Sequence, residues 1–329
     1  MKTCLIGISL AAMVVMSSDW ALAQEAQRST DPSESWISTG EVSLYARAVG
    51  QGHPAIVLHG GPDFDHGYLL PELDQLADIF RLIYYDQRGR GRSAEHVRPE
   101  EVTLASDIED VDRVRQHFRL EAPALLGHSW GSAVAALYAM HHPERVRSLI
   151  VVDGIPLRQS QLTEAFQQLW ASRDSVVQSR MIELWEARVA DPGNATICRD
   201  YLALYFVPFF ADSTAVTRST GDFCAGSPEA LRNQMDNVGE YTEASLGEWD
   251  WRASLREFSA PTLIVHGTAD PLPVEGAREW AEVLPNSRLL LLEGVGHFPY
   301  LEAPERFFSA VEEFLQGGWP DGAVRVGGE

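Results

Sequence analysis

Ser129 lies in the pentapeptide Gly-His-Ser-Trp-Gly at residues 127–131, which matches the Gly-x-Ser-x-Gly pattern of a nucleophilic serine. An aliphatic run precedes it and small, helix-forming residues follow it, which predicts a sharp turn between a strand and a helix. The amino terminus of that helix favours negative charge that develops beside it. The pattern therefore predicts that Ser129 attacks a carbonyl carbon.

A base must take the proton from such a serine, because a neutral hydroxyl is a poor nucleophile. His297 follows the last aliphatic run of the chain and is the candidate base. Asp270 follows the preceding run and is the candidate acid that orients the imidazole, while Asp153, after an earlier run, is the alternative acid. The order serine, aspartate, histidine along the chain favours Asp270.

Two backbone N–H groups are expected to hold the oxyanion that forms when the serine attacks. The N–H group of Trp130, directly after the nucleophile, is the first candidate. Gly61, in the turn after the first aliphatic run, is the second, and a glycine there lets the backbone approach the substrate closely. The predicted catalytic set is therefore Ser129, Asp270 and His297 with these two N–H groups.

The composition excludes several other chemistries. The chain has 329 residues with 47 acidic and 26 basic side chains, and its net charge of −21 disfavours a nucleic-acid partner. Lys2 is the only lysine, so its loss on maturation would exclude a Schiff base, a lysine base and a Walker-type phosphate loop. No Cys-x-x-Cys motif or histidine-rich cluster predicts a metal site, and the serine chemistry needs no cofactor. The predicted partner is a small-molecule or short-peptide substrate.

Six short aliphatic runs alternate with segments of helical character. Continuous runs of this kind predict a mostly parallel, doubly wound sheet covered by helices on both faces, which is an α/β fold. The runs lie at residues 55–58, 81–85, 123–126, 148–152, 262–265 and 288–292. We therefore expect a core at residues 24–156 and 258–315, a helical cap inserted at residues 157–257, and a loose tail at residues 316–329.

The first residues, 1–23, have the pattern of a secretory signal peptide. Lys2 supplies the positive start, residues 5–16 are apolar, and Ala-Leu-Ala at residues 21–23 is a cleavage site with small residues. The apolar run is too short to span a bilayer, so no membrane anchor is expected after cleavage. The sequence thus predicts an exported protein, either periplasmic or secreted.

Two cysteines, Cys198 and Cys224, remain after this cleavage, and both fall in the predicted cap. Export permits a disulfide, and an even number of cysteines favours one. Two free, buried thiols are the alternative, because spacing alone does not establish the geometry of a bridge.

Five segments together resemble the proline iminopeptidase family of the α/β-hydrolase superfamily, and the resemblance covers nearly all of the mature chain. They are the His-Gly-Gly-Pro loop at residues 59–62, the Asp-Gln-Arg-Gly signature within residues 85–93, the Ser-Trp-Gly-Ser turn at residues 129–132, and the acid and histidine segments at residues 266–270 and 296–298. The resemblance implies an α/β-hydrolase fold with a helical cap over the active site. It also implies release of an amino-terminal proline, or a similar residue, from short peptides.

The resemblance further implies that carboxylates of the cap bind the free amine of the substrate. Glu186, in a Trp-Glu pair like that of the family's cap, is the matching candidate, with an ordinary exposed glutamate as the alternative. Asp63 replaces the last glycine of the family's first loop and adds a charge near the substrate entrance. Leu202 stands where a second cap glutamate is expected, and Asp200 is a candidate substitute. The Asp-Gln-Arg segment is expected to brace loops.

These observations predict an exported serine hydrolase that works through an acyl-enzyme, with aminopeptidase activity on short peptides or amino-acid amides. A carboxylesterase or lactonase acting on small apolar esters is the alternative within the hydrolases. A non-catalytic ligand-binding receptor on the same fold is a third hypothesis, which the complete catalytic set disfavours.

Overall fold

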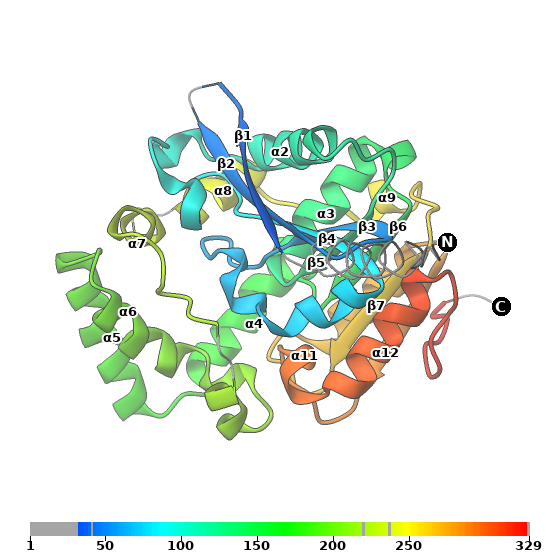
Figure 1. Cartoon of the computed structure of the whole chain (residues 1–329). Helices are drawn as coiled ribbons and strands as arrows, with labels where there is room; N and C mark the ends of the chain where they lie inside the picture. Colours follow the sequence, from blue (N-terminus) through cyan, green and yellow to red (C-terminus); the bar gives the residue numbers. More distant parts are fainter. Residues whose placement is uncertain (1–31, 41, 219–220, 236–237, 328–329) are drawn as a thin grey trace, which may run out of the picture.

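The computed structural model describes residues 32–40, 42–218, 221–235 and 238–327, so the predicted signal peptide lies outside the described residues. An eight-stranded sheet, in the order β1-β2-β4-β3-β5-β6-β7-β8, forms the centre of the molecule (Figure 1). The strands are β1 Ser33–Ser38, β2 Ser43–Val49, β3 His53–Leu58, β4 Phe80–Tyr85, β5 Ala124–His128, β6 Ser148–Val152, β7 Thr262–Gly267 and β8 Ser287–Leu292. All six predicted runs are strands of this sheet.

Strands β3 to β8 pair in parallel, and the predicted fold class is confirmed. Every residue of β5, β6 and β7 is buried. Their side chains alternate between two hydrophobic clusters, one on each face of the sheet. Because both faces are covered, both sets of side chains must be apolar, which explains the continuous aliphatic runs in the sequence.

The antiparallel strands β1 and β2 were not predicted from the sequence. β1 pairs with β2, and β2 pairs with β4, so the two strands extend one edge of the sheet. In β1 only Ile37 is fully buried, and Trp36 is half exposed. A strand that is covered on one side carries polar residues at alternate positions, and its aliphatic signal is correspondingly weak.

Helices cover both faces of the sheet. Apolar side chains of α2, α3 and α10 belong to the cluster on one face, and those of the 3-10 segment η2 and of α12 belong to the cluster on the other. Their bounds are η2 Glu72–Asp78, α2 Leu104–His117, α3 Trp130–His141, α10 Val274–Val283, α11 Pro299–Glu302 and α12 Pro304–Leu315. This two-sided arrangement leaves the loops at the strand ends free to form a site.

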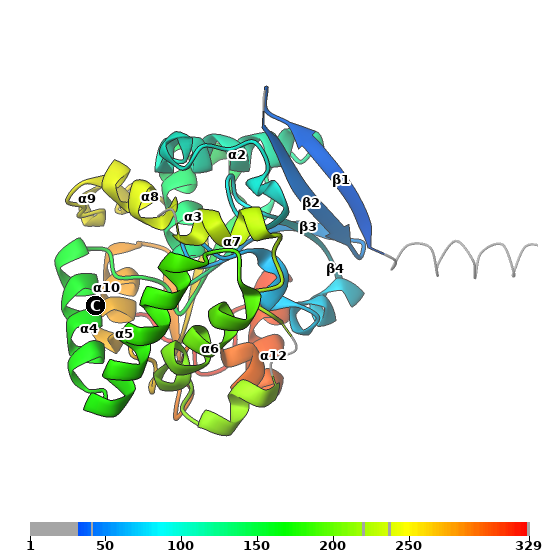
Figure 2. The same ribbon diagram turned by 90° about the vertical axis from the view of Figure 1, so that its left-hand side faces the viewer.

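The chain between β6 and β7 is largely helical. Its helices are α4 Gln159–Ala171, α5 Ser175–Ala190, α6 Ala195–Tyr205, α7 Pro228–Met235, α8 Val238–Leu246 and α9 Arg252–Leu255, with 3-10 turns at Val207–Phe209 and Ser213–Arg218. Asp174 and Asn194 cap α5 and α6 by accepting hydrogen bonds from backbone N–H groups of the first turn. In Figures 1 and 2, α5, α6 and α7 lie to one side of the sheet, apart from α2 and α12.

A disulfide joins Cys198 in α6 to Cys224 in the segment before α7, with the two Cα atoms 6.0 Å apart. The bridge that the sequence favoured is therefore present in the structure. It ties together two cap segments that are separated by 26 residues. A covalent link of this kind limits how far the two segments can move apart.

The prediction of a loose tail at residues 316–329 is wrong for the described residues up to 327. Val324 and Leu289 exchange two backbone hydrogen bonds of 2.8 and 2.9 Å, so the tail pairs with the outer edge of β8. The ring of Trp319 packs against Phe314 and lies 4.9 Å from the Arg288 guanidinium. An exposed strand edge offers unpaired backbone groups, and the tail satisfies some of them.

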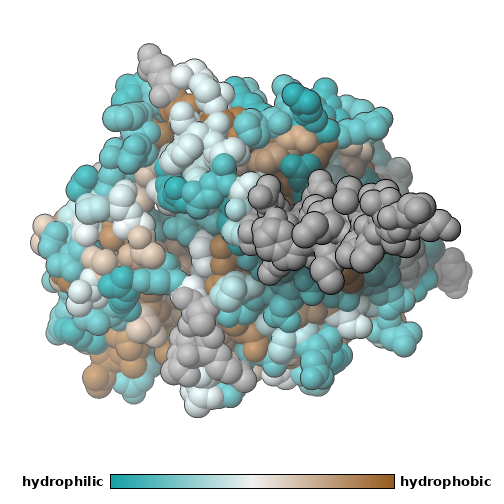
Figure 3. All heavy atoms as spheres, in the orientation of Figure 1, coloured by the Kyte–Doolittle hydropathy of each residue, from teal (hydrophilic) through white to brown (hydrophobic). Residues whose placement is uncertain are grey.

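The surface is mostly hydrophilic in the space-filling view of Figure 3, as expected from the large surplus of acidic side chains. Among the described residues, no helix is both long enough and apolar enough to cross a membrane.

Candidate active site

Ser129 occupies the predicted turn between β5 and α3. Its φ of 53° and ψ of −121° lie outside the regions that non-glycine residues favour. Its N–H group donates to the Val152 carbonyl at 2.9 Å, which fixes the turn to the neighbouring strand. A Cβ at Gly127 would clash with Gly131, and one at Gly131 would clash with the Leu58 carbonyl, so both glycines are needed for this packing.

The two candidate oxyanion donors lie beside this turn. Trp130 is the first residue of α3, so its N–H group has no acceptor within the helix. Gly61 has a φ of 141°, and a Cβ there would clash with the backbone nitrogen of Asp63. Gly61, Ser129 and Trp130 all line one cavity.

His297 and Asp270 form a buried pair, with 2.7 Å between Nδ1 of the imidazole and Oδ2 of the carboxylate. The other carboxylate oxygen of Asp270 accepts a hydrogen bond from the N–H group of Leu272. Burial lowers the pKa of His297 to about 4 and raises that of Asp270. Because burial disfavours the imidazolium, the ring is neutral near pH 7 and can accept a proton.

Asp153, the alternative acid, lies next to this pair but does not bond to the imidazole. Its Oδ1 atom accepts from the N–H group of Gly267 at 2.8 Å. Burial first, and then the charge of Asp270, raises the pKa of Asp153 well above its ordinary value. Of the two acids, Asp270 is the one that accepts the hydrogen bond from Nδ1 of His297, as the order of the residues along the chain predicts.

A chain of buried hydrogen bonds connects the three loops of the site. The Gly60 N–H group donates to the Tyr68 hydroxyl at 2.7 Å, and that hydroxyl lies 2.7 Å from Nδ1 of His128. Nε2 of His128 lies 2.8 Å from the carbonyl oxygen of His297. If the Tyr68 hydroxyl donates to Nδ1 of His128, each polar group in this series has a hydrogen-bond partner. No sequence motif marks Tyr68, so its place in this network could not be predicted.

The cavity in front of Ser129 has a volume of about 800 Å³, which suits a short peptide or a comparable small molecule. It lies between the core loops and the cap. Its charged lining residues are Asp63, Arg188, Glu240, Glu243 and Glu248, and its aromatic ones are Phe64, Trp130, Phe166, Trp185, Tyr201, Tyr205 and Phe209. Acidic side chains thus dominate the charged part of the lining.

Glu186 does not reach this cavity, so the predicted amine anchor requires correction. The side chain is exposed on α5, and Asp200 is exposed on α6. Trp185 and Arg188, three residues apart on the same helix, line the cavity instead. Successive helical residues point in directions about 100° apart, so a residue beside a cavity-lining position faces elsewhere.

Two glutamates of α8, Glu240 and Glu243, line the cavity, and no motif marks them in the sequence. They are three residues apart, which places both on one face of the helix. The pKa of Glu243 is raised, first because the surrounding protein partly desolvates the carboxylate and then by the charges of Asp63 and Glu240, although the side chain as a whole is exposed. Asp63 also lines the cavity, where the sequence analysis placed it.

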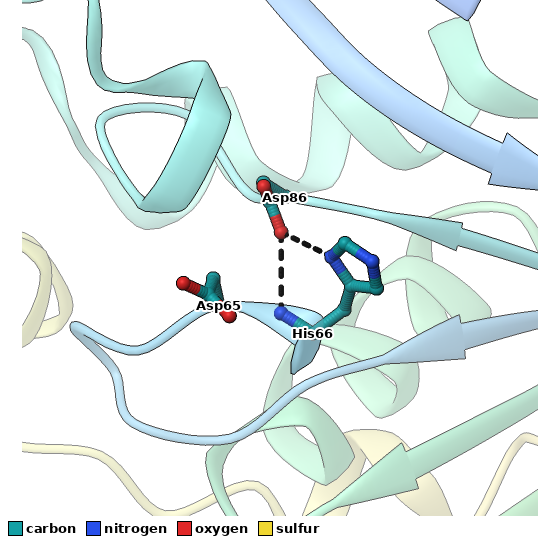
Figure 4. A group of neighbouring side chains, drawn as sticks. All are labelled: Asp65, His66 and Asp86. Carbon is teal, nitrogen blue, oxygen red and sulfur yellow. Dashed lines mark hydrogen bonds and ion pairs between the residues drawn. The ribbon is translucent and has the colours of Figure 1, made fainter. Parts of the chain in front are cut away.

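The Asp-Gln-Arg segment braces the loops, as predicted. Figure 4 shows Asp86 and His66 pointing toward each other, with 2.6 Å between Oδ1 and Nδ1, and Asp65 beside them. Asp86 also accepts from the N–H groups of His66 and Arg92. Burial alone would lower the pKa of His66, but the Asp86 carboxylate raises it. Both oxygens of Asp86 are therefore occupied by the protein itself.

Arg90 is the most extensively bonded residue of this segment, and it is 1% exposed. It donates to both carboxylate oxygens of Asp107 in α2 and to the Pro62 carbonyl in the Gly61 loop. It also donates to the Thr242 hydroxyl in α8 at 2.9 Å. One side chain thus connects the core, the loop of the oxyanion candidate and the cap.

Comparisons with known proteins agree with this architecture. Residues 54–190 match the α/β-hydrolase fold family, and residues 213–325 match the TAP-like protein family. The chain is 30% identical over 294 residues to the proline iminopeptidase of Lactobacillus helveticus (strain DPC 4571), covering 82% of this chain and 93% of that enzyme. It is 29% identical over 275 residues to the proline iminopeptidase of Heyndrickxia coagulans, covering 81% and 91%.

Solved structures show the same fold. The crystal structure of proline iminopeptidase from Mycobacterium smegmatis matches with a TM-score of 0.63 and 23% identity, over 86% of this chain and 98% of that one. The esterase EaEST from Exiguobacterium antarcticum matches with a TM-score of 0.64 and 21% identity, over 87% and 100%. On the family matches and the sequence relatives together, the chain belongs to the α/β-hydrolase family and is related to the proline iminopeptidases.

Proposed function

We propose that the protein is an exported serine hydrolase that removes an amino-terminal residue, proline or a similar one, from short peptides. One observation carries the proposal: Ser129, on a strained turn, lines a cavity together with Gly61, Trp130 and two glutamates of α8. The His297–Asp270 pair, with its 2.7 Å hydrogen bond, supports a general base for that serine.

In this mechanism the Ser129 hydroxyl attacks the carbonyl carbon of the first peptide bond, and Nε2 of His297 takes its proton. Asp270 holds the imidazole through Nδ1 and stabilises the imidazolium. The N–H groups of Gly61 and Trp130 stabilise the oxyanion. His297 then protonates the leaving amine, and water, activated by the same histidine, hydrolyses the acyl-enzyme.

The acidic lining supports a substrate with a free amine. Glu240 and Glu243 lie on one face of α8 and line the cavity together with Asp63. A concave site whose charged lining is mostly acidic attracts cationic groups more strongly than a flat surface does. The carboxylates would therefore favour an ammonium group at the amino terminus of a peptide.

An esterase acting on small apolar esters is the second candidate. Its support is the apolar part of the same cavity, which includes Ile155, Leu162, Phe166 and Leu272. These side chains offer an apolar acyl group a surface without a charged partner. The two candidates share the serine mechanism and differ in whether the free amine contributes to recognition.

Export belongs to the same proposal. The disulfide between Cys198 and Cys224 supports it, because such bridges persist mainly in oxidising compartments.

The test compares a proline anilide with short-chain nitrophenyl esters on the purified enzyme and on Ser129→Ala. We expect the anilide to have the higher kcat/KM, and the variant to lose at least about 10⁴-fold of kcat on both substrates. Circular dichroism and the urea midpoint of the variant verify that it folds. Substantial activity of a folded Ser129→Ala protein would contradict the serine mechanism, and ester hydrolysis without anilide hydrolysis would favour the esterase.

A further inference from the structure

Arg188 is a buried cation in the wall of the cavity. It lies in the last turn of α5, is 5% exposed, and lines the same cavity as Ser129. Guanidinium groups keep their charge under all ordinary conditions. Removing such a charge from water is unfavourable unless an anion or several hydrogen bonds compensate it.

The protein compensates this charge only in part. Nη2 of Arg188 donates to the side-chain oxygen of Gln234 at 3.2 Å, and the guanidinium lies 5.3 Å from the centre of the Tyr201 ring. Nε is buried and has no hydrogen-bond partner within the described part of the chain. Neither contact supplies a negative charge.

Within the described part of the chain, no carboxylate pairs with Arg188. Asp63 is the acid whose charge acts on it most strongly, yet none of the ion pairs within 4.0 Å among the described residues includes Arg188. Burial lowers the pKa of Arg188, as expected for a cation without a close anion. The guanidinium therefore retains hydrogen-bonding capacity at a position where the cavity can present a ligand.

We propose that Arg188, with Gln234 beside it, binds the free carboxylate of the substrate. A guanidinium offers parallel N–H groups that match the two oxygens of a carboxylate. With Glu240 and Glu243 on α8 lining the same cavity, the site then takes a zwitterion: a di- or tripeptide with both termini free. This inference deepens the proposed function and rests on it for the identity of the substrate.

The principal experiment uses a prolyl dipeptide and its carboxyl-terminal amide, which differ only in the carboxylate. For the wild-type enzyme, kcat/KM should be about 10- to 100-fold higher for the acid, since hydrogen bonds to charged groups have this size of effect. Arg188→Gln should remove most of this preference by acting on the acid alone. Arg188→Lys should retain part of it, because an ammonium keeps the charge and loses the forked geometry.

Arg180→Gln is the matched control. Arg180 lies on the same helix, is exposed and pairs with Glu183, so its substitution changes the net charge equally without touching the cavity. It should leave the ratio of acid to amide unchanged. A wild-type ratio near one, or equal losses on both substrates in Arg188→Gln, would overturn the carboxylate subsite.

A second measurement covers the case in which Arg188→Gln does not fold. Proline-containing acids and their amides are compared as competitive inhibitors of the wild-type enzyme, and the acid should have the lower inhibition constant by about 10-fold or more. Equal inhibition by acid and amide would contradict the inference without any variant.

The outcomes also separate this inference from the proposed function. If the proline anilide is hydrolysed but neither substrates nor inhibitors distinguish acid from amide, the aminopeptidase proposal stands and the Arg188 subsite is wrong. If peptides and anilides are inert, a nitrophenyl ester with a free carboxylate is compared with its neutral analogue. A preference for the charged ester that Arg188→Gln abolishes would keep the subsite and overturn the aminopeptidase proposal.

Discussion

Arg90 and Arg188 are both buried arginines near the proposed catalytic serine, but their surroundings differ. Arg90 bonds to both oxygens of Asp107, to two backbone carbonyls and to Thr242. Among the described residues, Arg188 has one hydrogen bond of 3.2 Å, to Gln234, and one aromatic neighbour, Tyr201. Arg90 is fully satisfied within the protein, whereas Nε of Arg188 is buried and has no partner among the residues that the structure describes.

The difference indicates that the region around Arg90 stabilises the structure, whereas the region around Arg188 is available to bind a ligand. The network around Arg90 has no free donor directed to the cavity, so its role is to hold the Gly61 loop, α2 and α8 in fixed positions. The region around Arg188 is incompletely satisfied and faces the space where a substrate would lie. Polar groups that a fold leaves unpaired at a cavity are those available to a ligand.

The largest expected effect is a loss of folding stability when Arg90, rather than Arg188, is replaced. Arg90→Met leaves the Asp107 carboxylate buried without its partner, and we expect a loss of about 3–5 kcal/mol in the free energy of unfolding. Arg188→Met leaves no unpaired carboxylate behind, so its change should be smaller than about 1 kcal/mol. Urea denaturation followed by fluorescence measures both values. Equal losses would show that Arg188 is as structural as Arg90.

A smaller effect is expected when an acidic residue of the cavity is neutralised. Glu243→Gln should lower kcat/KM for a proline anilide at least about tenfold, because a charged acceptor for the ammonium is lost. It should alter kcat/KM for an amine-free ester much less. Glu186→Gln is the control, since Glu186 lies in the cap outside the cavity. Equal losses on both substrates would remove Glu243 from amine recognition.

The smallest effect is a displacement of the pH profile. Because burial lowers the pKa of His297 to about 4, the imidazole stays neutral as the pH falls through 6.5. We expect kcat/KM for an amine-free ester to hold at pH 6 and to decline only at lower pH, where His297 becomes protonated. Such an ester avoids any contribution from titration of the substrate amine. Return to full activity after neutralisation checks that the protein stays folded, and a midpoint at or above 6.5 would contradict a buried, neutral base.

Much of the fold could be predicted from the sequence, because its physical causes are local. The strands from β3 to β8 are buried on both faces, so each appears as an aliphatic run. The edge strands β1 and β2 and the packed tail could not be predicted in this way. Most residues of β1 and of the tail are exposed, and β2 is buried but mixes polar and aromatic residues with its aliphatic ones. The pairing of all three segments also depends on strand edges that distant parts of the sequence form.

The candidate site likewise contains residues that the sequence predicts and residues that it does not. Ser129, Asp270 and His297 each follow a recognisable strand, so the ends of parallel strands were expected to meet. In the cap, no strand or motif marks which residues face the cavity. The match that points to Glu186 spans only two residues, and Glu186 lies outside the cavity, while Glu240 and Glu243 line it. Which face of a cap helix turns inward depends on its packing against the core.

The sequence by itself determined the α/β-hydrolase fold, the serine turn and the order of the candidate triad, because strand burial and glycine geometry leave local patterns. Only the tertiary structure decided that Asp270 rather than Asp153 bonds to His297, and that the cap contributes Glu243 and Arg188 to the cavity. It also showed that, within the described residues, Arg90 has a carboxylate partner and Arg188 has none. These features depend on contacts between segments distant in the chain, and the energy of a charge depends on the partners that folding brings to it.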